Sequence, residues 1–307
     1  MRKTFINTLV ELAESDRRIV LLTGDLGYTV IEPFAEKFPD RFFNVGVAEQ
    51  NMVGLATGLA EAGFIPFLYS IATFAVLRPY EFIRNGAILH QFPVRILGIG
   101  GGFEYGHAGT THHALEDVGV MRIQPGITTI VPADYQQARS ALLQTWDLPE
   151  PIYFRLGKDD INTIAGLNGN FVLGQTQLIG EGTDFLFITM GNITREVSQA
   201  METLQDEGIS SQVMIVSSFN PSPVEDLVKI LPRFKVAIAV EEHYITGGLG
   251  SFVAEVIAEE KLNCRLLRCG IKNKPTSISG NRNYLLSLHR LSVEYLVQSA
   301  KIALQKR

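Results

Sequence analysis

The chain has 307 residues, of which 46% are hydrophobic and 19% are charged, and its formal net charge is −5. This length and composition predict about two domains with enough apolar material for a core, and they exclude long disorder. The negative net charge, without any cluster of Lys and Arg, argues against nucleic-acid or membrane-surface binding.

The first half of the chain alternates short apolar runs with segments of helical period, which favours an α/β sheet. Several runs are apolar on both faces, as the strands of a parallel sheet covered on both sides require. Strands are expected at 18–25, 41–47, 64–70, 93–100, 128–133 and 151–158. Helices are expected at about 3–15, 48–62, 76–90, 113–121 and 134–145.

A second set of the same kind follows a looser stretch. Gly, Asn and Asp recur over 159–184, which indicates a connection with room for a short hairpin of its own. Beyond it, strands are expected at 184–191, 210–218, 236–243 and 264–270, and helices at 193–207 and 248–260. We therefore predict an α/β domain over 1–165, a connection over 166–183 and a second α/β domain over 184–307.

Glu49 stands at the start of an expected helix that is otherwise made of small and apolar residues. Helical spacing puts it on the same face as Val53, while Gly54 and Gly58 leave room for another backbone to approach. A buried carboxylate costs several kcal/mol unless something satisfies it. Glu49 therefore either has a hidden partner or exchanges a proton with a ligand, and a cap at a solvated corner is the remaining alternative.

Longer stretches around this acid resemble a known family. The segment GVAEQNMVGLATGLAEAGFIPF, together with ATFAVLRPYEFIRN at 72–85 and GTTHHALEDVGVMRIQPGITTIVPAD at 109–134, resembles the pyrimidine-binding domain of the transketolase family of thiamine-diphosphate enzymes. VEEHYITGGLGSFVAEVIAE at 240–259 resembles the family's C-terminal domain. The resemblance implies two α/β domains with mostly parallel sheets, and the likeness is greatest to the C-terminal subunit of a split transketolase. Such an enzyme transfers a two-carbon ketol unit between sugars, and phosphorylated sugars are the expected substrates.

The resemblance also implies which residues hold the cofactor. Glu49 matches the acid that hydrogen-bonds the cofactor's aminopyrimidine ring and so promotes loss of the proton from the thiazolium carbon. Phe74 matches the aromatic residue that stacks on the pyrimidine, and Tyr80 matches a second wall of that pocket. Leu77 stands where the family has another aromatic residue, and it still supplies an apolar wall. Asp25 matches an acidic position that approaches cofactor and substrate.

Three further residues are implied to face the substrate. His112 matches the histidine that binds or protonates the substrate's oxygen. Arg155 matches the arginine that grips a sugar phosphate, and it has no obvious acidic neighbour in the sequence. His107 stands where the family commonly has an acid, and Ala108 and Gly100 stand where it carries sugar-reading Asp and His, so the substrate's identity stays open.

A diphosphate site is not expected in this chain. The GDLG segment at 24–27 with Asn51 imitates the spacing of the family's metal-binding motif, but Leu26 interrupts the turn and Asn51 falls inside a helix. We therefore expect no metal ligand here. The resemblance then implies that thiamine diphosphate and Mg²⁺, or another divalent cation, are held with a separate N-terminal diphosphate-binding subunit, two copies of each.

Other functions are kept as alternatives. Within the same superfamily, the chain could be the β subunit of a 2-oxo-acid dehydrogenase or a deoxyxylulose-phosphate synthase-like enzyme. From another class, it could be a non-catalytic structural or regulatory binding subunit, although the joint presence of Glu49, Phe74, His112 and Arg155 argues against this.

Two features predict where the protein resides. The polar N-terminal stretch does not have the pattern of a signal peptide, and no run of about 18 apolar residues occurs. The two cysteines, Cys264 and Cys269, lie close together without a second pair, which favours a reducing compartment and argues against a zinc site or a disulfide framework. A cytoplasmic protein is expected.

Overall fold

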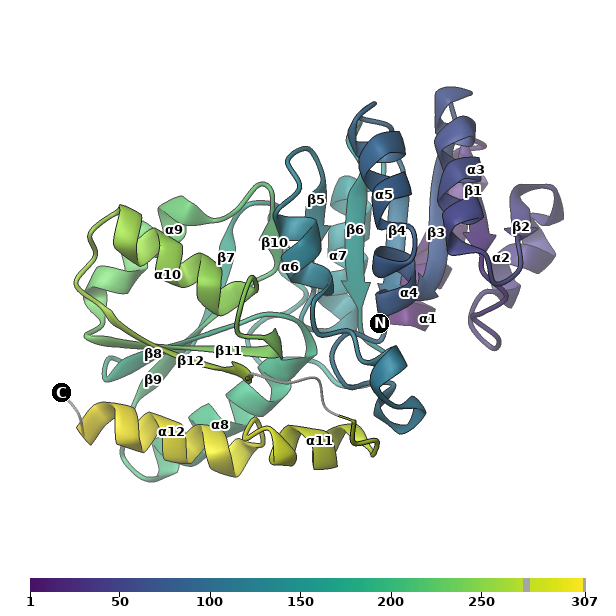
Figure 1. Cartoon of the computed structure of the whole chain (residues 1–307). Coiled ribbons are helices and arrows are strands. Elements are labelled where there is room, and N and C mark those ends of the chain that lie inside the picture. The colour runs from purple at the N-terminus through teal and green to yellow at the C-terminus, as the bar shows by residue number, and fades with distance from the viewer. Residues whose placement is uncertain (273–276, 306–307) are drawn as a thin grey trace.

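The computed structural model describes residues 1–272 and 277–305. Two sheets organise this part of the chain, and they lie side by side (Figure 1). The strands of the first sheet are β1 (Ile19–Thr23), β2 (Phe42–Asn44), β3 (Ile65–Ile71), β4 (Arg95–Ile99), β5 (Thr128–Ile130), β6 (Ile152–Leu156) and β10 (Ser218–Phe219). Those of the second are β7 (Thr176–Ile179), β8 (Phe185–Thr189), β9 (Ser211–Val216), β11 (Val236–Tyr244) and β12 (Arg265–Ile271). The strand orders are β10-β5-β6-β4-β3-β1-β2 and β12-β11-β8-β9-β7, and the pairs are parallel except β5–β10 and β7–β9.

Helices cover both faces of each sheet, so each unit has three layers (Figure 1). One face of the first sheet packs against α1 (Arg2–Ser15), α2 (Glu32–Lys37) and α7 (Tyr135–Thr145). The other face packs against α3 (Glu49–Glu61), α4 (Ala72–Leu77), α5 (Tyr80–Phe82) and α6 (Asp117–Arg122). In the second unit, α8 (Thr194–Asp206), α11 (Arg282–Leu288) and α12 (Val293–Gln305) lie on one face, and α9 (Val224–Ile230) and α10 (Leu249–Glu259) on the other.

The two-sided apolar strands are the reason for this layering. In β1, Ile19 and Leu21 enter one hydrophobic core while Val20 and Leu22 enter the core on the opposite face. Because side chains of a strand alternate between faces, a run of apolar residues is stable only where both faces are covered. The expectation of two α/β units with mostly parallel sheets is confirmed.

The connection between the units differs from the expectation. No hairpin forms within the described part of 159–184; instead β7 pairs antiparallel with β9, with Ile179 opposite Val213. The expected strand at 210–218 is also divided, because β9 ends at Val216 and β10, which begins at Ser218, joins the first sheet beside β5. The backbone N–H of Val131 donates to the Ser217 carbonyl at 2.9 Å and continues this pairing. The second half of the chain therefore completes the edge of the first sheet.

Three expected elements of the first unit are broken or shortened in the structure. The helix expected at 76–90 is broken into α4, α5 and a π-helical turn over Ile83–Ile88, with Pro79, which has no N–H for a helical bond, at the junction. The helix expected at 113–121 begins only at Asp117, because Ala114 pairs with Gly102 in an isolated bridge. The strand expected at 41–47 is reduced to β2. None of the helices in the described ranges is long and apolar enough to cross a membrane.

Candidate active site

The buried acid lies near the carboxyl end of β3 in the first sheet. Glu49 is the first residue of α3, and its side chain is 2% exposed. Ser70, in β3, donates its hydroxyl to Glu49 Oε1 at 3.3 Å. A Cβ added to Gly24, in the turn after β1, would lie 3.7 Å from the same oxygen. The carboxylate is thus enclosed by the ends of neighbouring strands, where ligands of open α/β sheets bind.

The hidden partner of Glu49 is Arg78, a residue without an expected role. Arg78 Nη1 donates to Glu49 Oε2 at 2.8 Å, and the Arg78 side chain is 42% exposed. The alternative of a cap at a solvated corner is wrong, because the Glu49 side chain is 2% exposed and its carboxylate oxygens are bonded to Ser70 and Arg78. Because Arg78 and Glu49 are 29 residues apart, no local spacing could indicate this pair, whereas the four-residue spacing from Phe74 to Arg78 could have indicated that those two side chains meet.

Two aromatic rings extend this contact toward the surface. The guanidinium carbon of Arg78 lies 3.9 Å from the centroid of the Phe74 ring. The imidazole of His112 meets the same ring edge-on, with centroids 4.9 Å apart. Thr111 Oγ1 is 3.0 Å from His112 Nδ1 and orients that imidazole. Glu49, Arg78, Phe74 and His112 therefore form one continuous group, which we call the acid–aromatic cluster.

The remaining candidate cofactor residues come from segments next to this cluster and have contacts of their own. The Asp25 carboxylate is exposed and accepts hydrogen bonds from Asn44 Nδ2 at 2.9 Å and from the Tyr28 hydroxyl at 3.0 Å. Leu77 is 37% exposed, at the end of α4. Tyr80 is half-buried and donates its hydroxyl to the Val120 carbonyl at 3.0 Å, so this hydroxyl already has a hydrogen-bond acceptor within the first unit. Their roles toward the cofactor stay predictions.

The loop 100–113, which we call the histidine loop, carries both candidate histidines. His107 is exposed in a 3-10 turn five residues before His112. Gly100 has a φ of 75°, and a Cβ there would lie 2.2 Å from Tyr105 Cε2, so Tyr105 occupies the space that a side chain at 100 would need. The absence of a side chain at this position is therefore part of the loop's packing.

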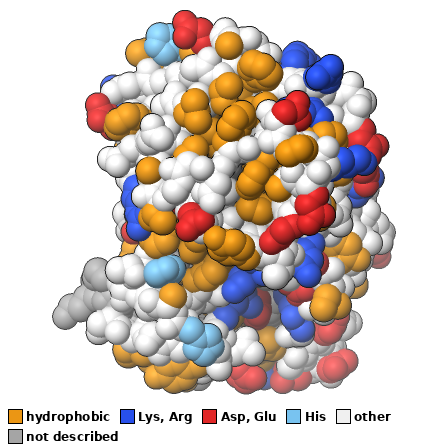
Figure 2. Space-filling view, turned by 90° about the vertical axis from the view of Figure 1, so that its right-hand side faces the viewer, with side chains coloured by type: hydrophobic (Ala, Val, Ile, Leu, Met, Phe, Trp, Pro, Cys, Tyr) orange, Lys and Arg blue, Asp and Glu red, His pale blue; other side chains and the backbone are white. Residues whose placement is uncertain are grey.

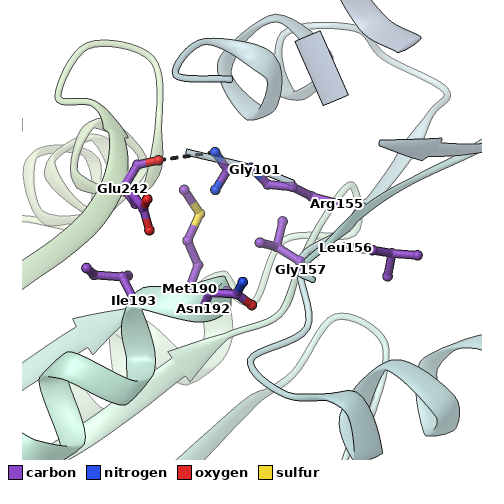
Figure 3. A pocket seen from close by; sticks show the side chains of 10 residues that line it. Gly101, Arg155, Leu156, Gly157, Met190, Asn192, Ile193 and Glu242 are labelled. Carbon is purple, nitrogen blue, oxygen red and sulfur yellow. Dashed lines mark hydrogen bonds between the residues drawn. The ribbon is translucent and has the colours of Figure 1, made fainter. Parts of the chain in front are cut away.

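Arg155 has an acidic partner that is distant in the sequence. Its Nε donates to Asp117 Oδ2 at 2.8 Å, and Asp117, 38 residues away in the chain, is fully buried. Arg155 Nη2 also donates to the carbonyls of Ala114 and Glu242, at 2.7 and 3.1 Å. Figure 3 shows the hydrogen bond between Arg155 and Glu242 beside a small pocket between the two units, which both residues line. The Nε and Nη2 donors of the guanidinium are therefore already used within the protein.

The end of β11 fastens the histidine loop to the second unit. Glu242 Oε1 accepts the backbone N–H of Phe103 at 2.7 Å, and Glu242 Oε2 is paired with Arg282 at 2.8 Å. A Cβ at Gly102, where φ is 68°, would lie 2.4 Å from Glu242 Cδ, so this close approach requires glycine. The motif at 240–259 therefore positions the loop of His112 from the second unit.

His243, the next residue, makes a second bond across the units. Its Nε2 accepts the backbone N–H of Gly119 at 3.1 Å, and Nδ1 lies 2.6 Å from the Tyr244 carbonyl. Burial lowers the pKa of His243 to about 4, so the ring is neutral at pH 7 and can act as this acceptor.

Metal-ligating side chains do not gather at this site. Across the described residues, no group of three or more His, Cys, Asp or Glu is placed to hold a metal ion. Asn51 is exposed on α3, and the Asp25 carboxylate is bonded to Asn44.

Comparison with known protein families identifies the class of protein to which the two α/β units belong. Residues 1–163 match the family described as "Transketolase, pyrimidine binding domain", and residues 174–294 match "Transketolase, C-terminal domain". The chain belongs to the transketolase family.

Within the family, it is similar over nearly its whole length to proteins that form part of a transketolase. It is 36% identical to a putative transketolase C-terminal section of Methanocaldococcus jannaschii, covering 97% of this chain and 94% of that protein. It is 35% identical to one subunit of an apulose-4-phosphate transketolase of Phocaeicola vulgatus, covering 97% and 96%. A solved structure of a split-gene transketolase, described as an inactive β4 tetramer, superposes with a TM-score of 0.87 at 33% identity, covering 99% of this chain and 97% of the other.

Proposed function

We propose that this chain is the pyrimidine-binding subunit of a thiamine-diphosphate-dependent transketolase, which transfers a two-carbon ketol unit between phosphorylated sugars. The observation that carries the proposal is the acid–aromatic cluster, in which a buried carboxylate, an aromatic ring and a histidine lie together. The similarity to a transketolase C-terminal section and to one subunit of an apulose-4-phosphate transketolase supports this activity.

The cluster fits the pyrimidine ring of the cofactor. Arg78 shows that a flat group with N–H donors can lie on the Phe74 ring while it donates to Glu49. An aminopyrimidine is also flat and carries N–H donors, so Phe74 would hold it by stacking and Glu49 by a hydrogen bond. When bound, thiamine diphosphate supplies a nucleophilic thiazolium carbon, which no amino-acid side chain offers.

The residues of this chain then have separate roles. Glu49 would share a proton with the ring nitrogen of the bound cofactor, and its burial would keep water from competing for that proton. His112 is half-buried at the outer end of the cluster, where its imidazole can donate a proton to the substrate's oxygen. Arg155, paired with Asp117, positions the loops between the two units instead of binding phosphate.

The diphosphate and its divalent cation require a second subunit, which we propose covers the side of the molecule with α3 and β2. Hydrophobic side chains gather on this side (Figure 2), and Val47 is 70% and Leu55 40% exposed. A Cβ at Gly54 or Gly58 would meet nothing within 4 Å, so this part of α3 is open to a partner. Exposed apolar surface of this kind marks interaction sites. The inactivity ascribed to the β4 tetramer of the split-gene transketolase agrees with a requirement for a different subunit.

Calorimetry tests the proposal. Thiamine diphosphate with Mg²⁺ is titrated into this chain, into the diphosphate-binding subunit and into their mixture. We expect metal-dependent binding at micromolar cofactor only in the mixture, together with ketol transfer. Tight, metal-dependent binding by the isolated chain would overturn the division of the site between two subunits, and a mixture that neither binds cofactor nor transfers a ketol unit would overturn the function.

A further inference from the structure

Arg78 occupies both surfaces that the cofactor's pyrimidine ring would use. Its Nη1 donates a hydrogen bond to Glu49 Oε2 at 2.8 Å, and its guanidinium carbon lies 3.9 Å from the centroid of the Phe74 ring. A guanidinium is planar, donates hydrogen bonds in its own plane and stacks on aromatic faces. Arg78 and an aminopyrimidine therefore cannot hold this carboxylate oxygen and this ring face at the same time.

The exposure of the two charged side chains indicates which of them is fixed. Glu49 is 2% exposed, whereas Arg78 is 42% exposed and follows the last residue of α4. An unpaired carboxylate at this depth is costly, while an arginine with much of its surface in water regains solvation when it leaves. Glu49 therefore needs a partner, and Arg78 is the partner that can be exchanged.

We propose that Arg78 is a displaceable placeholder for the cofactor, which neutralises Glu49 and covers Phe74 until the pyrimidine ring enters and takes its place. This inference rests on the proposed function and adds a residue that lowers cofactor affinity to keep the empty pocket stable. The observed affinity is the intrinsic affinity multiplied by the fraction of molecules in which Arg78 has moved aside.

The size of the effect follows from the two contacts that are lost. An ion pair with one well-exposed partner and a cation–π contact are each worth about 0.5–1 kcal/mol at such a site, which corresponds to roughly 5–30-fold in affinity. Arg78→Met keeps the length of the side chain but removes its charge and its hydrogen-bond donors.

The experiment compares cofactor affinity in the assembled two-subunit complex. We expect Arg78→Met to bind thiamine diphosphate roughly 5–30-fold more tightly than the wild type in calorimetry with Mg²⁺. Arg84→Met is the matched control, because Arg84 is exposed, lies six residues further along and donates to its neighbour Asn85. It should leave the affinity unchanged. Arg78→Lys, which keeps the charge but lacks the planar fork, should lie between wild type and Arg78→Met.

A second readout uses this chain alone. Without cofactor, Arg78→Met should unfold at lower temperature than Arg84→Met, because Glu49 loses its partner. In a Glu49→Gln background, Arg78→Met should no longer lower the unfolding temperature. Circular dichroism confirms that each variant is folded before affinity is measured.

The outcomes separate the two proposals. A wild-type complex that does not bind thiamine diphosphate would overturn the proposed function and this inference with it. A wild-type complex that binds, with Arg78→Met and Arg78→Lys unchanged or weaker, would leave the function standing and overturn the placeholder role, since Arg78 would then be indifferent to the cofactor or in contact with it.

Discussion

At the residue scale, the main feature is the Glu49 carboxylate, which lies at a position where an ionised group is costly to bury. The start of a helix favours a negative charge, whereas burial opposes it. The protein resolves this conflict with Arg78 and Ser70, which satisfy both carboxylate oxygens of Glu49. The proposed cofactor would replace the first of these partners by a ring that shares a proton.

Replacing Glu49 tests this proton sharing. Glu49→Gln keeps the shape but removes the ionisable group, so the assembled complex should exchange the thiazolium proton for deuterium very slowly, and turnover should fall by ~10²–10⁴-fold. Excess cofactor should not restore the rate. Quenched-flow exchange followed by NMR measures this, and Glu61→Gln, an exposed acid at the other end of α3, is the control. Wild-type exchange in Glu49→Gln would assign activation of the cofactor to another group.

Replacing Arg155 tests a structural role against a substrate role. Arg155→Met leaves the buried Asp117 carboxylate without its cation, which typically costs about 3–5 kcal/mol of stability. Urea unfolding should show this loss, and a second substitution, Asp117→Asn, should recover part of it. If stability were instead unchanged and the Michaelis constant rose only for phosphorylated substrates, the residue would be a phosphate ligand after all.

At the scale of elements, β11 links the second unit to the histidine loop of the first. Glu242 holds the Phe103 backbone, and His243 accepts the Gly119 N–H at the start of α6. Two successive side chains of one strand therefore reach opposite parts of the same neighbouring unit, as the alternation of a strand allows. Displacement of β11 would move the loop that carries His112.

This link should make the contribution of His243 to stability depend on pH. The folded-state pKa of His243 is lowered from 6.5 to about 4 by burial, with Asp117 opposing and Arg155 reinforcing the shift. On acidification the unfolded chain therefore binds this proton first, and the contribution of His243 to stability falls as the pH drops from about 6.5 to 4, by on the order of 2–3 kcal/mol.

His243→Gln isolates this contribution. The amide oxygen of glutamine can still accept a hydrogen bond, but the side chain does not titrate. Unfolding free energies measured by urea titration at several pH values should fall less steeply in the variant than in wild type between pH 6.5 and 4. Parallel curves for the two proteins would show that His243 is not the group responsible. The comparison with wild type is necessary because burial also raises the pKa of Glu241 to about 7, which gives the opposite slope in the same range.

At the scale of the whole molecule, one side is left apolar and open. It lies next to the acid–aromatic cluster, because Glu49 and Leu55 belong to the same helix. A partner that covers this side would also close the cluster against water, which would strengthen the polar contacts inside it.

A charge on this side should prevent assembly. Leu55→Arg should weaken association with the diphosphate-binding subunit by at least about tenfold, because a buried interface would have to desolvate an unpaired guanidinium. Ile302→Arg is the control, since Ile302 is 45% exposed on α12 in the second unit. Analytical ultracentrifugation of the mixed subunits measures both. Equal association of Leu55→Arg and wild type would place the partner on another side.

Much of the architecture was predictable from the sequence because its signals are local. Two-sided apolar strands and helices such as α3 and α8 follow from periodicity within about fifteen residues, which also put Glu49 on the apolar face of α3 but left a solvated cap as an alternative. The resemblance then placed Phe74 and His112 in one site, and the structure brings their rings together.

The tertiary structure alone decided the pairings between distant segments. Asp117 and Arg155 are 38 residues apart, and Phe103 and Glu242 are 139 apart, so no local pattern could connect them. The pairing of β10 with β5 of the first sheet could not be predicted from a local pattern either, because it depends on which strand edge is open when the two units meet. The sequence by itself thus determined the two α/β units and pointed to Glu49, whereas the fold determined the partner of Glu49, Arg78, and paired Arg155 with the buried Asp117, since the charge that balances a buried group is set by what packs against it.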